Sequence, residues 1–365
     1  NKTNGGNREP PQLRTWLCGS AGRGKTRTLR CTVQHVRLLF QEADVDATVE
    51  LTAYTGIAAF NIGFGAKTCC SSFNISGTGA WKKEVKGDAA RRLEQQWRSV
   101  VLLIVDEISF IGTSFFARMH FRLQQGRSRY FSERGLDPSG YTFGDASVIL
   151  VGDFGQLEPI DDVSLVDQET TRESLHKNLR HLMTHIRYGR YLLREFNEAF
   201  MLNRIHRSKD DLWWTESCLR LRDFTCKKEE DYDVWMLHDL DRGHLTVEQK
   251  RYFDEEAVWL CARCEDVGDR NGRKLRNMVE TRGEVVHKIE AVHLGTYAQQ
   301  KKAKKYDSKA FEGLRDTVHL VRGCKVMLTR NVNYAKGLAN GTRGKVVGIV
   351  YGSGGLGTFP EAIVV

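Results

Sequence analysis

A glycine-rich turn between an apolar run and a helix-like segment constrains this chain more than any other feature. Residues Gly19 to Thr26 read GSAGRGKT, which fits the phosphate-loop pattern GxxxxGKT. The apolar run Leu13 to Cys18 precedes the turn, and apolar residues recur at helical spacing from Lys25 to about Ala43. Strand, loop and helix in this order predict backbone N–H groups and a helix N-terminus that bind a phosphate chain. A turn that only caps the following helix is the alternative interpretation.

The residue types of this loop fit the binding of a nucleoside triphosphate. Gly19, Gly22 and Gly24 permit backbone angles that are closed to other residues. Lys25 is expected to reach the β- and γ-phosphates, and Thr26 is expected to place its hydroxyl on Mg²⁺. We therefore predict that the loop binds ATP together with Mg²⁺.

Composition and charge narrow the class of protein. The chain has 365 residues, of which 41% are hydrophobic and 28% charged, as in soluble globular proteins with one or more domains. No apolar run approaches the roughly 18 residues of a membrane span, so we expect no membrane partner. The net charge of +9 favours a polyanionic partner. Basic residues gather at Lys301, Lys302, Lys304 and Lys305 and along Arg263 to Arg276, although either run also fits a solvated face.

The cysteines and histidines do not predict a metal centre. The nine cysteines are scattered and odd in number, which indicates reduced thiols inside a cell. Cys261 and Cys264 form one CxxC pair without a second pair at finger-like spacing, so we do not expect zinc. His181 and His185 lack the glutamate of a zinc-protease motif and fit an ordinary helix surface.

Alternating strand and helix patterns predict an α/β domain with helices on both faces of a parallel sheet. A boundary near residue 200 would give a first domain over 1–200 and a second over 201–365. An Asn340-Gly341 pair predicts a hairpin, and four glycines near the end predict a flexible terminus. Strands are expected at 48–54, 100–105, 147–151, 258–261, 284–287 and 325–329, and helices at 88–98 and 109–125. The four glycines near the end are Gly352, Gly354, Gly355 and Gly357.

Two adjacent carboxylates follow a strongly apolar strand. Leu102 to Ser109 reads LLIVDEIS, and the carboxyl edge of a parallel sheet is where nucleotides bind. Asp106 is expected to hold the Mg²⁺ shell, and Glu107 to orient and deprotonate the attacking water. A helix-capping pair is the alternative, but together with the phosphate loop these residues predict an ATPase.

A third segment, Val148 to Pro159, reads VILVGDFGQLEP, and with the first two motifs it resembles the superfamily-one DNA helicases of the Pif and RecD type. The resemblance includes TAYTGIAAFNI at 52–62, the pair Phe143-Gly144, and GCKVMLTRNVNYAKGLANGTRG at 323–344. It implies a P-loop NTPase with a RecA-like sheet and an incomplete second RecA-like domain. It also implies an ATP-dependent helicase that moves 5′ to 3′ on single-stranded and partly duplex DNA, in repair, recombination and telomere maintenance.

The resemblance assigns further site residues. Gln156 is similar to the family glutamine that senses the γ-phosphate, with Asp153 alongside. Thr55 and Gly56 fall in the segment that touches single-stranded DNA through its backbone. Arg207, within FMLNRIHRS, resembles the arginine that reaches the γ-phosphate from the second domain; a surface arginine is the alternative. Candidates for base stacking, each also suited to a core, are Phe60, Phe73, Trp81, Trp213 and Trp214.

The chain departs from the family pattern at several positions. Arg23 stands where the family carries a threonine, which either adds a phosphate contact or crowds the nucleotide. Cys70 replaces a histidine, and Arg263 and Cys264 stand near an expected threonine and asparagine. The family's final motif does not occur before Val365, so we expect a fragment or a truncated, Helitron-like copy that starts downstream of its natural beginning. An ATP-gated or inactive nucleic-acid-binding remnant is the competing hypothesis, and the expected compartment is intracellular, either nuclear or mitochondrial.

Overall fold

The computed structural model describes residues 12–76, 81, 84–167, 169–171, 173–237, 245–303, 314–330, 332–333, 336–338, 340–353 and 359–365. The chain divides into two compact units, one ending at Cys226 and the other beginning at Lys227. We expected the division near residue 200. It lies later because β6 (Glu198–Met201) pairs with β1 (Arg14–Cys18), which keeps the following residues with the first unit.

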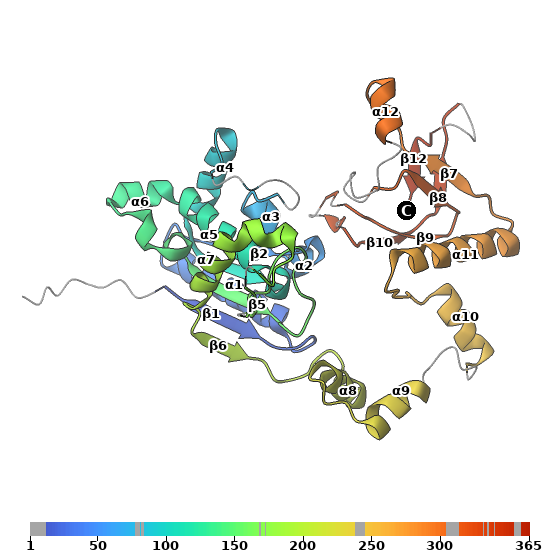
Figure 1. The fold of residues 1–365 in the computed structure, drawn as a ribbon, viewed down its shortest axis with the longest axis horizontal. Helices are drawn as coiled ribbons and strands as arrows, with labels where there is room; N and C mark the ends of the chain where they lie inside the picture. The colour runs from blue at the N-terminus through green and yellow to red at the C-terminus, as the bar shows by residue number, and fades with distance from the viewer. Residues whose placement is uncertain are drawn as a thin grey trace, which may run out of the picture. The chain divides into compact units, whose positions relative to one another are not determined.

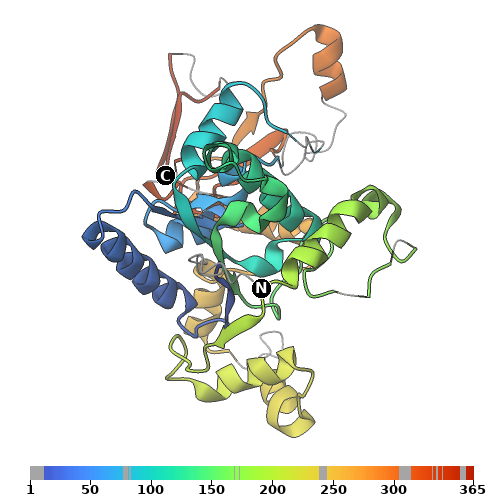
Figure 2. The ribbon, with the colours of Figure 1, turned by 90° about the vertical axis from the view of Figure 1, so that its left-hand side faces the viewer.

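Six parallel strands form the sheet of the first unit, in the order β3-β2-β4-β5-β1-β6 (Figure 1). All of the pairings between them are parallel. The remaining strands are β2 (Thr48–Ala53), β3 (Lys67–Thr68), β4 (Val100–Asp106) and β5 (Ser147–Gly152). The predicted α/β class is confirmed, and the strands expected at 48–54, 100–105 and 147–151 are present. The sequence did not predict β6, which lies at the edge of the sheet (Figure 2).

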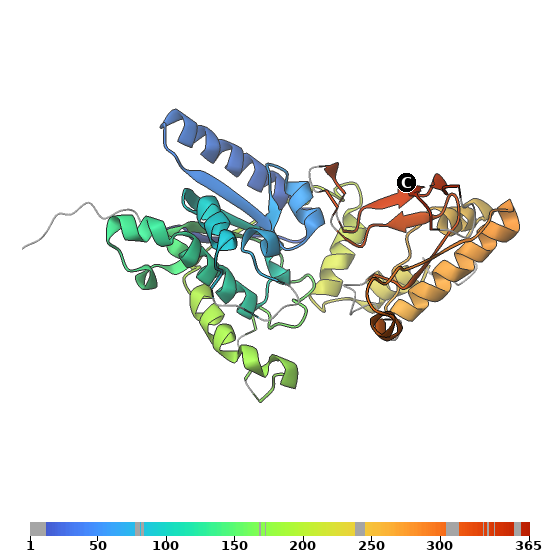
Figure 3. The same ribbon diagram turned by 90° about the horizontal axis from the view of Figure 1, so that it is seen from above.

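Both faces of this sheet are buried. Successive side chains of a strand point to opposite faces, so Leu102 and Ile104 of β4 enter one apolar cluster while Leu103 and Val105 enter the other. Helix α1 packs on the first face and α5 and α7 on the second, and α1 and α7 lie on opposite sides of the strands in Figure 3. A strand that is apolar on both faces is typical of a parallel sheet covered by helices.

The helices follow the predicted segments closely. The helices expected after the loop and at 88–98 are present, and the one expected at 109–125 begins slightly later, after a short 3-10 turn at Ile108–Phe110. The helices of the first unit are α1 (Lys25–Glu42), α2 (Gly56–Ile62), α3 (Cys69–Ser72), α4 (Asp88–Trp97), α5 (Thr113–Gly126), α6 (Ser128–Arg134), α7 (Met183–Leu193) and α8 (Leu212–Arg222).

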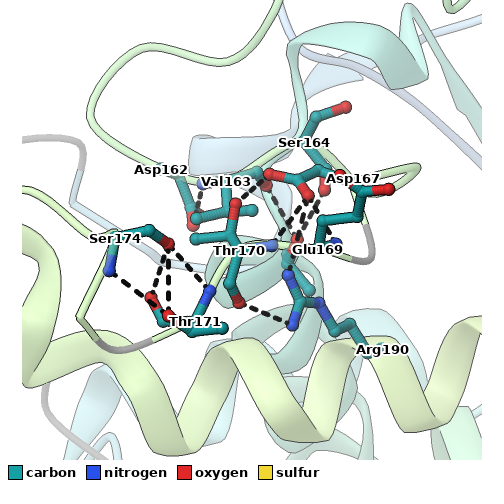
Figure 4. A network of polar contacts seen from close by, with 10 residues as sticks. Asp162, Val163, Ser164, Asp167, Glu169, Thr170, Thr171, Ser174 and Arg190 are labelled. Carbon is teal, nitrogen blue, oxygen red and sulfur yellow. Dashed lines mark hydrogen bonds and ion pairs between the residues drawn. The ribbon is translucent and has the colours of Figure 1, made fainter.

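Polar contacts fix the segment between β5 and α7. Asp162 accepts hydrogen bonds from the backbone N–H groups of Ser114 (3.2 Å) and Phe115 (3.0 Å), which caps the N-terminus of α5. Figure 4 shows the neighbouring network, in which the Arg190 guanidinium of α7 donates to the Thr170 carbonyl at 3.1 Å. Asp167 accepts from the N–H of Thr170 at 3.0 Å in the same network. The segment that follows Gln156 is therefore tied to two helices of the first unit.

The second unit has a different architecture. Its described strands pair antiparallel in three two-stranded sheets, and α11 packs along them through Leu275, Met278 and Val279. The pairs are β7 (His287–Glu290) with β8 (Thr317–Leu320), β9 (Lys325–Met327) with β10 (Arg343–Lys345), and β11 (Gly348–Val350) with β12 (Ala362–Val364). The helices are α9 (Asp233–Leu237), α10 (Val247–Glu255), α11 (Cys264–Arg282) and α12 (Tyr297–Ala303). The sequence predicted an incomplete second RecA-like domain over this part of the chain, and that assignment stays a prediction.

Several predictions for this unit need correction. The strand expected at 258–261 does not form, and Leu260 is 96% exposed. The strand expected at 284–287 lies at β7 instead. A hairpin does form between β9 and β10, with Asn340-Gly341 inside its long connection, where the Gly341 N–H donates to the Leu328 carbonyl at 2.7 Å.

Strand β12 lies beyond the four glycines for which we expected a flexible end. Some residues of these predictions lie outside the described residues, namely Lys304, Lys305, Gly354, Gly355 and Gly357.

Candidate nucleotide-binding site

The glycine-rich loop joins β1 to α1, as predicted. Gly22 (φ 81°) and Gly24 (φ 88°) adopt the left-handed backbone conformation that disfavours side chains. The Lys25 ammonium donates to the carbonyls of Gly19 (2.6 Å) and Ser20 (3.4 Å), so its charge is held inside the loop. Thr26 lies in the first turn of α1. Backbone N–H groups, a helix N-terminus and a cation thus face the same small region.

The two carboxylates follow β4. Asp106 is 5% exposed, and burial raises its pKa to about 6 against the lowering effects of the Glu107 N–H and of the Lys25 cation. The Glu107 N–H donates to Asp106 Oδ1 at 2.9 Å. Glu107 itself has a φ of 56°, an uncommon conformation for a residue with a side chain, and its Oε2 is buried without a hydrogen-bond partner among the described residues. The pair has no helix-capping hydrogen bond, since η1 (Ile108–Phe110) begins without one.

A tight turn after β5 carries Gln156. The Gln156 N–H donates to the Asp153 carbonyl at 3.0 Å, and the Gly155 N–H donates to Asp153 Oδ1 at 3.0 Å. Asp153 is 6% exposed and forms a two-point ion pair with Arg222 of α8, at 2.8 Å and 3.3 Å. The sequence placed Asp153 beside Gln156 but did not indicate Arg222.

Strand register brings these motifs to one edge of the sheet. Cys18 at the end of β1 pairs with Gly152 at the end of β5, and β4 lies on the other side of β5. Burial and the Asp153 carboxylate raise the pKa of Cys18, and the Lys25 cation acts against them. The same cation lowers the pKa of Asp106. The structure therefore brings Lys25, Asp106 and Asp153 close together, with Gln156 on the adjoining turn.

Arg207 lies beside the loop within the first unit, whereas we expected it to come from a second domain. The residues after β6, Leu202–Arg222, are called here the post-β6 segment. The N–H groups of His206 (2.9 Å) and Arg207 (3.2 Å) donate to the Gly22 carbonyl. A Cβ at Gly22 would meet the Arg207 Cβ at 2.8 Å, so the close contact requires glycine.

Comparison with known proteins identifies the family. The family model described as PIF1-like helicase matches residues 10–184, and the model of the DNA helicase Pif1 2B domain matches residues 314–349. Together the two models cover more than half of the chain. The chain belongs to the Pif1-like helicase family.

Relatives of this Pif1-like chain are distant. It is 26% identical over 339 residues to the ATP-dependent DNA helicase PIF1 of Xenopus laevis, a match that covers 91% of this chain and 44% of the relative. For the human ATP-dependent DNA helicase PIF1 the identity is 24% over 336 residues, covering 91% and 44%. The chain thus spans about half the length of the curated relatives that it matches.

Solved structures share the fold. Pif1 helicase from Bacteroides, in complex with ADP-AlF3 and ssDNA, matches with a TM-score of 0.59 and 20% identity over 93% of this chain and 67% of that chain. Pif1 helicase from Candida albicans matches with a TM-score of 0.52 and 21% identity, covering 93% and 66%. These matches agree with the P-loop fold predicted from the sequence.

Arg23, where the Pif1-like pattern has threonine, makes hydrogen bonds to protein groups on both sides of the loop. Its Nε donates to Ser20 Oγ at 2.6 Å, and its Nη1 donates to the carbonyls of Asn203 (2.5 Å) and Leu202 (3.4 Å). In this Pif1-like chain Arg23 thus connects the phosphate loop to the post-β6 segment.

Of the residues expected to contact DNA, Thr55 and Gly56 lie just after β2. Thr55 is exposed and caps α2, accepting a hydrogen bond from the Ala58 N–H at 3.2 Å, while Gly56 is buried. Phe73 is buried and stacks on Trp97 with ring centroids 4.8 Å apart, so it is a core residue. Trp81 packs under the Arg122 guanidinium at 4.2 Å. Large exposed fractions remain at Phe60 (48%), Trp213 (38%) and Trp214 (49%).

Neither a metal cluster nor a membrane span is found where the structure is described. No group of three or more His, Cys, Asp or Glu side chains among those residues could hold a metal ion. None of the described helices is long and apolar enough to cross a membrane. Cys261 and Cys264 are free thiols.

Proposed function

We propose that this chain binds and hydrolyses ATP with Mg²⁺ as the motor of a DNA helicase. The observation that carries the proposal is the edge of the first sheet, where the glycine loop, Lys25 and the buried Asp106 lie together. Relatives named as ATP-dependent DNA helicases support the same function. Translocation and duplex unwinding belong to this proposal as well.

The loop and the first carboxylate bind the triphosphate and its metal. Loop N–H groups and the Lys25 ammonium hold the β- and γ-phosphates, while the Thr26 hydroxyl and Asp106 would hold Mg²⁺. Asp106 suits this role because a buried carboxylate with a raised pKa gains from a nearby cation. When bound, Mg²⁺ supplies charge neutralisation at the β- and γ-phosphate oxygens.

Three further side chains act on the γ-phosphate. Glu107 accepts a proton from the attacking water, a role that suits a buried carboxylate oxygen without a protein partner. Gln156 orients that water or the γ-phosphate from the adjoining turn. Arg207 stabilises the charge that develops on the transferred phosphoryl group, since its backbone already lies against the loop.

DNA binding is assigned to the ends of the neighbouring strands. The backbone of Thr55 and Gly56 contacts single-stranded DNA, and the exposed Phe60, Trp213 and Trp214 are candidates for base stacking. The partner is single-stranded or partly duplex DNA, with 5′ to 3′ movement. We further propose an intracellular role in repair, recombination or telomere maintenance, in the nucleus or the mitochondrion.

Phosphate release by the 365-residue chain tests the proposal. Lys25→Ala is expected to lower DNA-stimulated ATP hydrolysis about a hundredfold or more, because the loop loses its cation at the developing charge. Lys177→Ala, at an exposed lysine in the same unit, is the matched control and should hydrolyse ATP at the unaltered rate. Unchanged turnover in Lys25→Ala would refute the site. DNA binding without hydrolysis by the unaltered chain would favour the ATP-gated remnant.

A further inference from the structure

Two arginines anchor the post-β6 segment to the loops of the nucleotide site. Arg23 reaches from the phosphate loop to the start of the segment, and Arg222 reaches from its end to the turn that carries Gln156. We propose that Arg23 and Arg222 are positioning residues that hold Arg207 and Gln156 in place for ATP hydrolysis. This inference rests on the proposed function of the site.

The first anchor joins the loop to the residues just before Arg207. The Arg23 guanidinium donates to Ser20 Oγ within the loop and to the Asn203 carbonyl outside it. A planar guanidinium can make these contacts at once, which the threonine typical of the family cannot. Arg23 holds the start of this stretch, and the hydrogen bonds to the Gly22 carbonyl hold its end. Together they fix the backbone from Leu202 to Arg207 against the loop.

The second anchor fixes the turn of Gln156 through Asp153. The carboxylate of Asp153 accepts two contacts from Arg222 and one from the Gly155 N–H, so a single buried side chain joins α8 to the turn. The guanidinium lies directly over Gly155, where an added Cβ would clash with Arg222 Nε. Gly155 is not among the glycines with positive φ, so its backbone permits alanine, and the added methyl group would force the guanidinium to move.

Both anchors act on groups that the chemistry places at the γ-phosphate. The segment between them carries Arg207, and the turn that it holds carries Gln156, whereas the contacts of Arg23 and Arg222 described above are to protein groups. Loss of an anchor should therefore slow turnover more than it weakens nucleotide binding, since a small displacement of a catalytic group costs rate. If Arg23 instead contacted the phosphate directly, its substitution would weaken nucleotide binding.

Arg222→Ala and Gly155→Ala provide two independent ways to release the second anchor. The first removes the cation, and the second retains both charges but displaces the guanidinium. We expect each to lower kcat for ATP about tenfold with less than about a threefold change in KM, and the double variant to be no slower than either one. Gly140→Ala, at a glycine without positive φ and with open space around it, is the control.

Hydrogen exchange in the nucleotide-free chain separates failure of this inference from failure of the proposed function. Arg222→Ala and Gly155→Ala should speed exchange of the Gly155 and Gln156 amides, and Arg23→Ala that of the His206 and Arg207 amides, whether or not ATP is hydrolysed. Arg222→Lys should restore part of the turnover. Unchanged exchange and unchanged kcat in these variants would overturn the inference, and so would a loss confined to KM.

Discussion

In the first unit a six-stranded parallel sheet is buried on both faces, whereas the described strands of the second unit pair only two at a time. The first sheet places the ends of β1, β4 and β5 side by side, so residues far apart in the sequence meet at one edge. Among the described residues of the second unit, one small apolar cluster forms around Leu320, Val321, Cys324 and Val346. A site built from several strand ends depends on a continuous sheet, and among the described residues only the first unit has one.

Core truncations should separate the two units most clearly. Phe116 is fully buried in the first unit, and Phe116→Ala is expected to lower its free energy of unfolding by about 3–5 kcal/mol. Leu320→Ala in the second unit should cost roughly 2 kcal/mol, because its smaller cluster closes more easily around the lost side chain. Hydrogen exchange measured peptide by peptide reports each unit separately. Equal loss of protection in both units after Phe116→Ala would show that they unfold together.

A buried histidine should make the stability of the first unit depend on pH under mildly acidic conditions. His120 is 1% exposed, its Nδ1 accepts the Phe143 N–H at 2.9 Å, and its Nε2 lies 3.0 Å from Tyr188 Oη. Burial lowers the pKa of His120 to about 4, below its ordinary value of 6.5. The unfolded chain therefore binds the proton first, and the contribution of His120 to stability falls as the pH drops from 6.5 to 4. Asp106, whose pKa burial raises to about 6, contributes with the opposite sign in this range.

The expected loss from this one histidine is at most roughly 3 kcal/mol. Urea unfolding monitored in the first unit at several pH values measures it. His120→Gln removes the titrating group while keeping a polar side chain, so the unaltered chain should lose stability relative to this variant as the pH falls. Parallel pH profiles for the two proteins would contradict the assignment.

The smallest expected effect is a gain in the second unit. Gly268 lies inside helix α11 with open space around its position. Gly268→Ala should stabilise that unit by about 0.5–1 kcal/mol, because alanine loses less backbone entropy in a helix. The midpoint of thermal unfolding should rise for the second unit and stay constant for the first. Gly283→Ala, at a φ of 65° after the same helix, should have the opposite sign.

The features that could be predicted from the sequence are those encoded by residues close together in the chain. Three motifs each lie within a few residues of a strand end, namely the phosphate loop, the Asp106-Glu107 pair and the Gln156 turn. The sequence therefore predicted both the motif and its place in the fold. The apolar run of β4 predicted burial on both faces for the same reason. Each of these predictions needed only the chain near the motif.

Contacts between distant residues explain what the sequence could not predict. Arg222 and Asp153 are 69 positions apart, and no pattern links the end of α8 to the turn after β5. The contacts of Arg23 could not be predicted because its partners after β6 are backbone carbonyls, which every residue has. Val258 to Cys261 had the composition of a strand, but a strand also needs a hydrogen-bonded neighbour, which this segment lacks within the described part of the chain.

The burial of β4 on both faces has a consequence for mutation. Four consecutive apolar side chains, Leu102 to Val105, would fill the two clusters almost as well if the strand slid along its neighbours. Hydrophobicity therefore does not by itself determine where the strand stops. A one-residue deletion in β4 would leave a stable apolar strand and yet withdraw the Asp106 carboxylate into the sheet, so the protein would keep its fold and lose the carboxylate that we propose as a magnesium ligand.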